Sequence, residues 1–222
     1  MIVLGLDTST RFSSVAIVRD DEILADVRGD AAGRGTDLLV LVDRACADAK
    51  LAPRDLDAVA IGAGPGSFTS LRIGMATAKG IAFAAGRPLW AVSSLAALAS
   101  PADGELVVAV LDARRGEVYA GVFRSEAGHV VAVGTERVLP PDRLAELGTP
   151  TRYVGDAGAA FPQLASLPGA WDRTPTGAAI ARLALAGSRA NVLVDGVPAY
   201  IRPAEAEILY PDGVPGALRR RP

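Results

Sequence analysis

The sequence predicts an α/β protein of two similar lobes, each a mixed sheet with flanking helices. Short apolar runs bounded by turn residues indicate strands, and they alternate with longer stretches that lack helix-breaking residues. The opening of the chain also recurs: a shift of 105 positions (107 minus 2, and 120 minus 15) places residues 2–7 over residues 107–112, and residues 15–19 over residues 120–124. Two strands joined by a turn after an aspartate therefore occur twice, which favours a duplication over a chance match.

The first half of the chain contains the predicted elements of one complete lobe. Turn residues at 7–10 and an Arg-Asp-Asp turn at 19–21 separate the first three strands, and a Ser-Ser pair caps a short helix near the end of this half. The expected elements are strands at residues 2–6, 13–19 and 22–28, a helix at 36–49, a strand at 56–61, a helix at 71–85, a strand at 89–92 and a helix at 94–99.

The second half repeats this plan in a shorter form. Its later elements are a short helix at residues 142–147, a strand at 152–154 and a helix at 176–186. We expect an N-terminal lobe at residues 1–101, a smaller C-terminal lobe at 102–196, and a segment at 197–222 that returns to the N-terminal lobe. Two βββαβα units in tandem describe the actin-like (acetate and sugar kinase, actin) architecture.

Composition indicates a soluble, cytoplasmic protein that does not hold nucleic acid by itself. The chain has 222 residues, half of them apolar, and a formal net charge of −2 from 23 basic and 25 acidic side chains. Nucleic-acid binding requires clustered Lys and Arg, and the one basic run, at residues 219–221, reads as a solvated tail. The sequence shows no signal peptide, and a Gly-Arg-Pro break interrupts the apolar stretch at residues 81–99, so we expect no membrane span.

Common metal and nucleophile sites are missing from the sequence. His129 is the only histidine and Cys46 the only cysteine, so paired-histidine metal motifs, a Cys/His zinc site and an internal disulfide are all excluded. A Ser-His-Asp arrangement would have to use His129, yet the chain has no nucleophile-elbow motif. We therefore expect a surface histidine, a buried structural thiol, and neither catalytic nor metal-binding residues.

The loop before the helix at residues 71–85 is the most informative stretch of the chain. It reads Gly62-Ala-Gly-Pro-Gly-Ser-Phe-Thr-Ser-Leu-Arg-Ile-Gly74. Its Gly-Pro-Gly turn leaves amide groups uncovered, and two hydroxyl residues are candidate N-caps, so the loop suits an anion. The glycine spacing fits neither a Walker loop nor the dinucleotide fingerprint, and a tight turn without a ligand is the alternative. The residues that could face an anion are Gly64, Pro65, Gly66, Ser67 and Thr69.

A second loop could face the same anion. Asp7, Thr8 and Ser9 follow the first strand and offer a carboxylate for a hydrated metal, with hydroxyls and amides for phosphate. Actin-like ATPases grip phosphate between two such hairpins, of which the second normally offers an Asp-x-Gly turn. The second hairpin here, Asp112-Ala-Arg-Arg-Gly-Glu117, places two bulky cations where the backbone should be bare. The site therefore reads as vestigial, with no tightly bound cofactor, and Asp7 reads mostly as a turn former.

The two cations of that hairpin have two interpretations. Arg114 and Arg115 could contact an acidic partner or RNA phosphate. They could equally form the solvated tip of a hairpin. The sequence leaves both interpretations open.

Two predicted helices carry more apolar surface than one sheet can cover. In the helix at 36–49 an apolar run spans more than one turn, and in the helix at 71–85 only Arg72 and Lys79 are charged. One stripe of the second helix (Leu71, Met75, Ala78 and Ala82) can face its own sheet. These helices could be buried inside a larger lobe or covered by a protein partner. The small size of the chain favours a partner. The candidate partner contacts are Leu38, Leu41 and Val42 on the first helix and Ile73, Ala76, Gly80 and Ala84 on the second.

The loop sequence resembles a known family signature. Residues 64–74 are similar to the GPGSFTGLRIG string of the TsaB (YeaZ) family, with Ser70 where the family usually has glycine. Residues 197–202 resemble the Pro-x-Tyr-Leu-Arg segment of the same family. The resemblance covers nearly the whole chain and is most specific at residues 62–74, 112–119 and 198–202. Residues 34–37 depart from it, since the family often has His-Ser-Glu before the first helix.

The resemblance implies a non-catalytic role in tRNA modification. TsaB proteins look like degenerate paralogues of TsaD, the catalytic subunit that carries a metal-binding histidine pair and the nucleotide, and they assist threonylcarbamoylation of adenosine in bacterial tRNA. A heterodimer with a TsaD-type paralogue through the two apolar helices is implied, with a homodimer when TsaD is absent and a TsaE-type ATPase at or near the heterodimer. ATP and Mg would act through partner subunits, and tRNA would be met only through the complex.

Other functions remain as alternatives. A small-molecule kinase or ATPase would use Asp7 and the Gly-Pro-Gly loop, and a purely structural homodimer would use the apolar helices. A peptidase, an old label for relatives of this fold, is disfavoured because the chain lacks both a metal pair and a triad.

Overall fold

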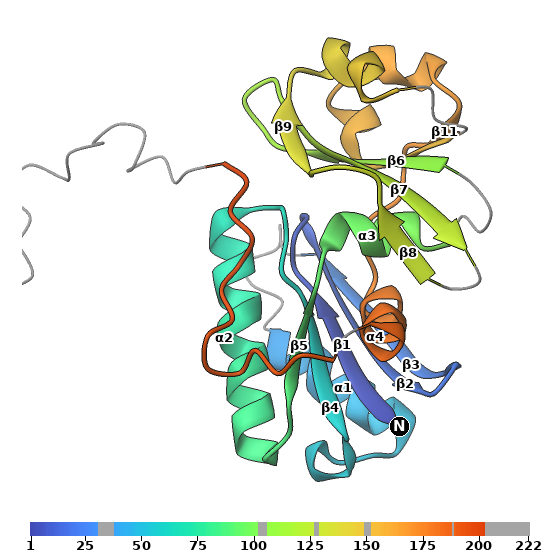
Figure 1. The fold of residues 1–222 in the computed structure, drawn as a ribbon. Helices are drawn as coiled ribbons and strands as arrows, with labels where there is room; N and C mark the ends of the chain where they lie inside the picture. Colours follow the sequence, from blue (N-terminus) through green and yellow to red (C-terminus); the bar gives the residue numbers. More distant parts are fainter. Residues whose placement is uncertain (31–37, 102–105, 127–128, 149–151, 188, 203–222) are drawn as a thin grey trace, which may run out of the picture.

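The computed structural model describes residues 1–30, 38–101, 106–126, 129–148, 152–187 and 189–202. Two α/β lobes lie one above the other, as Figure 1 shows, and the predicted two-lobe architecture is confirmed. The unusual stretch at 34–37, the first residues of the expected C-terminal lobe at 102–105 and the basic run at 219–221 lie outside the described residues. The lobe limits drawn from sequence position therefore stay a prediction.

The first sheet has the strand order β3-β2-β1-β4-β5. Its strands are β1 (Ile2–Asp7), β2 (Phe12–Arg19), β3 (Glu22–Asp30), β4 (Ala58–Gly62) and β5 (Leu89–Val92). Neighbours among β1, β2 and β3 are antiparallel, whereas β4 and β5 run parallel to β1. Leu4 and Leu6 belong to the core on one face, and Val3 to the core on the other. Because both faces are buried, the strands appear in the sequence as continuous apolar runs.

The second sheet repeats this order with strands of the second half, β8-β7-β6-β10-β11. Its strands are β6 (Leu106–Asp112), β7 (Val118–Glu126), β8 (His129–Ala132), β10 (Arg152–Gly155) and β11 (Gly169–Ala170), and β9 (Arg137–Leu139) pairs with β7. Again three strands are antiparallel and two run parallel to the central one. Order and direction match those of the first sheet, as the predicted duplication requires.

Two helices from the first half and one from the second cover the first sheet. α1 (Leu38–Ala49) and α2 (Phe68–Ala85) lie on one face, and α4 (Gly177–Ala186) lies on the other. The predicted sheet-facing stripe of α2 is buried at Leu71, Met75, Ala78 and Ala82. Thr176 caps α4 by accepting a hydrogen bond from the Ala179 amide at 3.1 Å.

The second sheet is covered by shorter helices. α3 (Ser94–Ala99) packs on one face, and the 3₁₀ helices η2 (Pro141–Leu147), η3 (Ala157–Ala159) and η4 (Pro162–Ser166) lie on the other. α3 follows the last strand of the first sheet, whereas α4 follows the last strand of the second. Each sheet is therefore covered on one face by a helix that follows the last strand of the other sheet.

The strand register corrects the single offset assumed for the repeat. Leu6 pairs with Val15 on the face that α1 and α2 cover, and Val110 pairs with Ala120 on the face that η2, η3 and η4 cover. The second strand keeps the offset of 105 (120 minus 15), but the first strand has an offset of 104 (110 minus 6). Asp112 lies one position beyond the residue that corresponds to Asp7. Because side chains alternate along a strand, this shift of one residue places the two aspartate side chains on opposite faces of their sheets. The two aspartates are therefore not equivalent.

α4 approaches β1 closely at a pair of glycines. A Cβ on Gly5 would lie 2.0 Å from the carbonyl oxygen of Gly177, and a Cβ on Gly177 would lie 2.5 Å from that of Gly5. Any larger residue at either position would separate the helix from the sheet. The Gly177 amide also donates to the Ser14 hydroxyl at 2.9 Å, which satisfies one of the donors at the start of α4.

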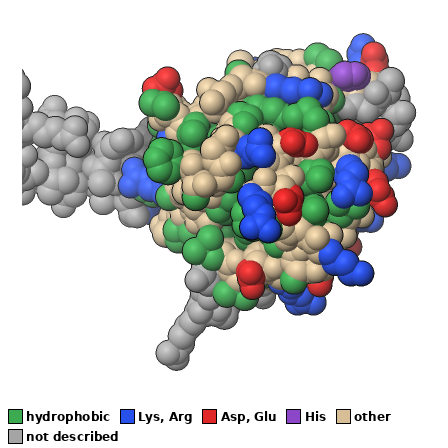
Figure 2. All heavy atoms as spheres, turned by 90° about the horizontal axis from the view of Figure 1, so that it is seen from below, with side chains coloured by type: hydrophobic (Ala, Val, Ile, Leu, Met, Phe, Trp, Pro, Cys, Tyr) green, Lys and Arg blue, Asp and Glu red, His purple; other side chains and the backbone are tan. Residues whose placement is uncertain are grey.

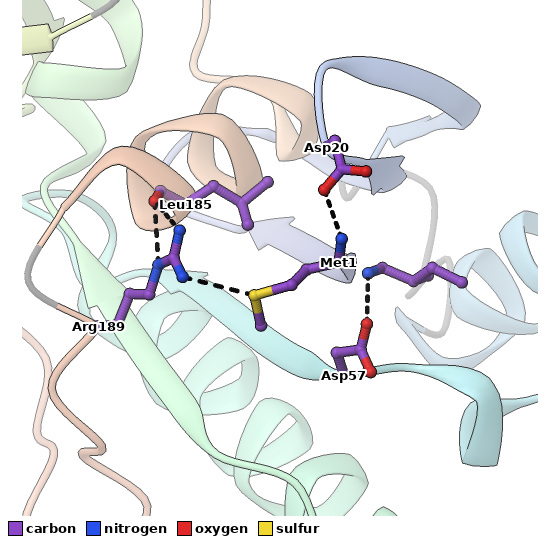
Figure 3. Close-up of polar contacts among 6 residues, drawn as sticks. Met1, Asp20, Asp57, Leu185 and Arg189 are labelled. Carbon is purple, nitrogen blue, oxygen red and sulfur yellow. Dashed lines mark hydrogen bonds and ion pairs between the residues drawn. The ribbon is translucent and has the colours of Figure 1, made fainter.

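Polar contacts hold the lower end of the first lobe. Figure 3 shows the ammonium group of Met1 paired with Asp20, and the Ile2 amide donates to Asp57 at 2.8 Å. Arg189 donates to the Leu185 carbonyl at 3.0 Å through Nε, which closes the C-terminal end of α4. The surface at this end, seen in Figure 2, has acidic and basic side chains interspersed with apolar ones, so this view contains no large patch of one sign.

The cysteine and the histidine occupy the predicted environments. Cys46 is buried, and burial raises the pKa of its thiol, with Asp43 and Asp55 adding to the effect. His129 is exposed at the start of β8. Within the ranges given above, none of the helices combines the length and the apolar character that a membrane span requires.

Gly5→Ala should lower the free energy of unfolding by about 1–3 kcal/mol, because the added methyl group must displace the backbone of α4. Urea unfolding followed by circular dichroism measures the change. Gly80→Ala is the matched control: its Cβ would meet no atom within 4 Å, so it should stabilise the chain by about 0.5–1 kcal/mol through helix propensity. Equal stability of Gly5→Ala and the wild type would contradict the close packing of α4 on β1.

Candidate functional site

Two loops meet where β1 and β4 end. These strands are parallel neighbours, so their carboxyl ends lie at the same edge of the sheet, where α/β proteins commonly bind ligands. The turn at residues 7–9 follows β1, and the loop at residues 63–67 follows β4 and leads into α2. The Ser67 amide donates to the Ser9 carbonyl at 2.9 Å, and a Cβ on Gly66 would lie 2.3 Å from the same oxygen. The structure therefore brings the two predicted loops into direct contact.

Asp7 is a buried carboxyl group with hydrogen bonds to both oxygens. Oδ1 accepts from the amide of Ser9 at 2.9 Å and from its hydroxyl at 2.6 Å, and Oδ2 accepts from the Ser94 hydroxyl at 2.7 Å. Gly62 leaves the necessary room, since a Cβ there would lie 2.0 Å from Oδ2. The bond to the Ser9 amide is that of an Asx turn, which supports the structural interpretation of Asp7.

Ser94 is a site residue that the sequence does not reveal. The sequence indicates only a Ser-Ser helix cap, and Ser93 takes that role by accepting from the Ala96 amide at 3.1 Å. Ser94 is fully buried, and its hydroxyl donates to Asp7 while accepting from the Gly64 amide at 3.2 Å. The position of Ser94 just after β5 is the one feature of the sequence that could have indicated its role. β5 runs parallel to β4, so the residues that follow the two strands lie at the same edge of the sheet.

Burial raises the pKa of the Asp7 carboxyl group, and hydrogen bonds from Ser9 and Ser94 oppose part of that rise. The folded chain therefore binds a proton at Asp7 up to a higher pH than the unfolded chain does. The contribution of this group to stability is fully present below the ordinary aspartate pKa. It is lost as the pH rises through the pKa of the folded state.

The amide groups of the Gly-Pro-Gly loop are partly used inside the protein. Gly64 has a φ of 108° and is joined to Pro65 by a cis peptide bond. The amides of Gly64 and Ser67 have acceptors on Ser94 and Ser9, so these two are not uncovered as the sequence predicts. Ser67 is the N-cap residue of α2 without a side-chain cap hydrogen bond. Thr69 lies inside the first turn, and its predicted capping role is wrong.

Thr8 fastens the turn to α2. Its hydroxyl donates to the Ser70 carbonyl at 2.9 Å, and Gly74 makes room, since a Cβ there would lie 2.2 Å from Thr8 Oγ1. The Ser70 hydroxyl, at the position where the family signature has glycine, donates to Ser67 Oγ at 3.1 Å. The serine is therefore accommodated at the surface of the loop.

The second aspartate hairpin is closed by its own arginine. The Arg114 amide donates to Asp112 Oδ1 at 2.7 Å, and the guanidinium pairs with Oδ2 at 3.1 Å. Arg114 and Arg115 have φ values of 61° and 55°, which non-glycine residues rarely adopt. The Asp112 amide donates to Asp156 at 3.0 Å, and burial raises the pKa of that carboxyl group. Both arginines are exposed, and their contact with RNA or an acidic partner stays a prediction.

The structure corrects the predicted partner face of α1. Leu38, Leu41 and Val42 are buried in the core of the first lobe, so they are not a free surface. The apolar run covers every side of the helix, and the sequence alone does not show which side meets the sheet. Leu39 and Val40 are the outward residues, with 53% and 60% of their surface exposed.

The predicted partner face of α2 is exposed. Ile73 has 55% of its surface exposed, and Ala76, Gly80 and Ala84 are also exposed. Phe83, which was not among the predicted contacts, is 77% exposed on the same helix. Exposure makes these residues accessible to a partner, and the contact itself stays a prediction.

The chemistry of this site is that of hydroxyls, amides and one buried carboxyl group. Across the described ranges, histidine, cysteine, aspartate and glutamate do not gather in any group of three or more that could hold a metal ion. The polar groups at Asp7, Ser9 and Ser94 bond to one another, and the arrangement stabilises two loops and the start of α3.

Asp7→Asn should gain stability relative to the wild type as the pH rises from 4 to 8, because the amide cannot ionise whereas the buried aspartate must. Urea unfolding at several pH values measures the difference. Glu146→Gln is the control of opposite sign: hydrogen bonding to Arg143 lowers the pKa of Glu146, so this variant should lose stability relative to the wild type over the acid part of the range. A difference between Asp7→Asn and the wild type that does not change with pH would contradict the burial argument.

Comparisons with known proteins extend these observations. The family model described as "TsaD: tRNA N6-adenosine threonylcarbamoyltransferase" matches residues 35–210. The tRNA threonylcarbamoyladenosine biosynthesis protein TsaB of Escherichia coli (strain K12) is 34% identical over 173 residues, covering 74% of this chain and 75% of that protein. TsaB of Bacillus subtilis (strain 168) is 34% identical over 144 residues, covering 63% of this chain and 60% of that protein. The chain therefore spans less than two thirds of the length of the B. subtilis relative.

The three-dimensional comparison leads to the same family. YeaZ from Pseudomonas aeruginosa superposes with a TM-score of 0.76 and 31% identity, covering 90% of this chain and 99% of that chain. Sequence and structure therefore agree: the chain belongs to the TsaB (YeaZ) family of tRNA threonylcarbamoyladenosine biosynthesis proteins.

Proposed function

We propose that this chain is the non-catalytic subunit of a tRNA threonylcarbamoyladenosine synthesis complex, in which it pairs with and activates a TsaD-type transferase. The family gives the pathway, and the match to a TsaD family model supports a paralogous partner of similar fold. The observation that carries the pairing is a glycine in the middle of α2.

Gly80 has no packing partner among the residues that the structure describes. Glycine in a helix interior costs about 1 kcal/mol relative to alanine. A Cβ on Gly80 would meet nothing within 4 Å, whereas a Cβ on Gly74 of the same helix would lie 2.2 Å from Thr8 Oγ1. Gly74 is thus explained by internal packing and Gly80 is not. A second helix that approaches α2 closely from outside would account for it.

The surface around Gly80 suits such a helix. Ile73 and Phe83 are large exposed apolar residues, and Ala76 and Ala84 lie near them on the same helix. Apolar side chains grouped on the outer side of one helix typically mark a protein contact. A paralogue with the same fold would offer a corresponding helix, and a second copy of this chain could use the same face when the paralogue is absent.

Three features support a non-catalytic role. Arg114 forms an ion pair with the carboxylate of Asp112, and Asp112 does not occupy the position in the second sheet that Asp7 occupies in the first. The amides of Gly64 and Ser67 have acceptors within the protein. We therefore assign ATP and Mg to the partner subunits, including a TsaE-type ATPase, and group transfer to the TsaD-type paralogue. In this proposal the complex works in the cytoplasm, and tRNA reaches the chain only through that complex.

Reconstitution tests the activating role. Transfer of the threonylcarbamoyl group to adenosine in tRNA should be weak with the TsaD-type and TsaE-type proteins alone and should rise when this chain is added. The chain by itself should transfer nothing. Magnesium-dependent ATP binding by the isolated chain would instead favour a kinase or ATPase.

Gly80→Glu should weaken binding of the TsaD-type paralogue by at least about 100-fold, because an unpaired charge buried in the interface costs roughly 3–5 kcal/mol. Isothermal titration calorimetry measures the affinity, and circular dichroism checks that the variant stays folded. Ala165→Glu is the matched control, because Ala165 is exposed on η4 of the other lobe. Unchanged affinity of Gly80→Glu would rule out α2 as the contact face.

A further inference from the structure

Residues 191–202, here called the strap, run from the end of α4 along the first lobe (Figure 1). The Val192 amide donates to the Leu89 carbonyl at 2.8 Å, and the Leu89 amide donates to Asn191 Oδ1 at 3.1 Å. Lys79 on α2 donates to the Val194 carbonyl at 3.0 Å. The strap is thus fixed beside β5 and against α2 before it reaches the candidate site.

Near its end the strap contacts both the candidate site and the start of α2. The Ala199 amide donates to the Ala63 carbonyl at 2.7 Å. The Tyr200 hydroxyl accepts from Arg72 Nε at 3.1 Å, and the Tyr200 ring lies 5.0 Å from the Phe68 ring, centroid to centroid. The Arg72 guanidinium lies 3.9 Å from the centre of the Phe68 ring. Two aromatic rings and a cation therefore join the strap to the first turn of α2.

The next two residues bind the second lobe. Ile201 packs against the core formed by α3 and β6. Arg202 donates to the Ala113 carbonyl at 2.7 Å and pairs with Glu117, so it holds both sides of the Asp112–Glu117 hairpin. Its side chain is only 17% exposed, which makes this ion pair more than a loose surface contact.

We propose that residues 199–202 form a rigid link through which a partner on α2 fixes the position of the second lobe. Tyr200 and Arg202 are two residues apart, and an extended chain spans about 7 Å over that distance, so the link has little slack. A movement of the hairpin relative to α2 must break the contacts at one end. Tyr200 is also 41% exposed beside the outer face of α2, where a partner can reach it. The partner's part in this rests on the proposed function.

Hydrogen exchange on the isolated chain tests the link without any partner. Arg202→Met should speed exchange by about tenfold at the Ala113 amide, which is bonded inside the hairpin, and also at the distant Leu71 amide in the first turn of α2. Tyr200→Ala should have the reciprocal effect, since coupling between two sites acts in both directions. Acceleration confined to the mutated end would overturn the proposal.

Two further variants keep that test interpretable. Arg143→Met breaks the ion pair between Arg143 and Glu146, which lies in the second lobe away from the strap. It should change the exchange rate of neither the Ala113 amide nor the Leu71 amide. Tyr200→Phe keeps the ring and loses only the acceptor for Arg72, so it reports on the link if Tyr200→Ala unfolds the chain. Tyr200→Phe removes the hydrogen bond with Arg72. If exchange at the Ala113 amide is nevertheless unchanged in this variant, that result would count against the link.

The partner is then added in a second arm. The TsaD-type paralogue should slow exchange at Ala113 and Glu117 of the wild type, and this slowing should be lost in Arg202→Met although the complex still forms. Retention of the slowing in Arg202→Met would overturn the link. Absence of any complex with the wild type would refute the proposed function instead, and the result on the isolated chain would still decide the link.

Discussion

The close contact between α4 and β1 is the constraint on which the rest of the structure depends. α4 follows the second sheet in sequence, yet its backbone lies on β1 at Gly5 and Gly177. α3 makes the reverse exchange and packs on the second sheet. The first sheet therefore cannot bury both of its faces without a helix that lies after the second sheet in the sequence. The packing of the first lobe thus depends on residues from both halves of the chain.

The Asp7 turn is held by hydrogen bonds within the protein. Hydrogen bonds from Ser9 and Ser94 occupy the carboxyl group, and burial makes ionisation costly. These bonds join the turn after β1 to the start of α3, and the Gly64 amide, which donates to the Ser94 hydroxyl, joins the loop after β4 to the same point. In the second lobe Arg114 plays a comparable part for Asp112. Each aspartate thus stabilises the loop that carries it.

The sequence predicted the strands of the first sheet, the strands β6, β7 and β10, the long helices and the meeting of the two loops, because these follow from apolar periodicity and from the ends of parallel strands. The short strands β8, β9 and β11 were not predicted. It did not predict which side of α1 faces the sheet, since Leu38–Val42 is apolar on every side and only packing selects Leu38 and Leu41 for burial. Ser94 was missed because its partner Asp7 is 87 positions away. The sequence alignment wrongly matched Asp7 with Asp112. Two strand residues are equivalent only if their side chains point to the same face of the sheet, and an alignment of the two sequences does not show the face.

The strap also has a consequence for how the chain behaves in concentrated solution. β5 is the outermost strand on its side of the first sheet, and an outermost strand offers its peptide groups to any similar strand it meets. Asn191 and Val192 occupy the groups of Leu89. Release of the strap would expose these peptide groups of Leu89 at the edge of the sheet, where a strand of another molecule could pair with them.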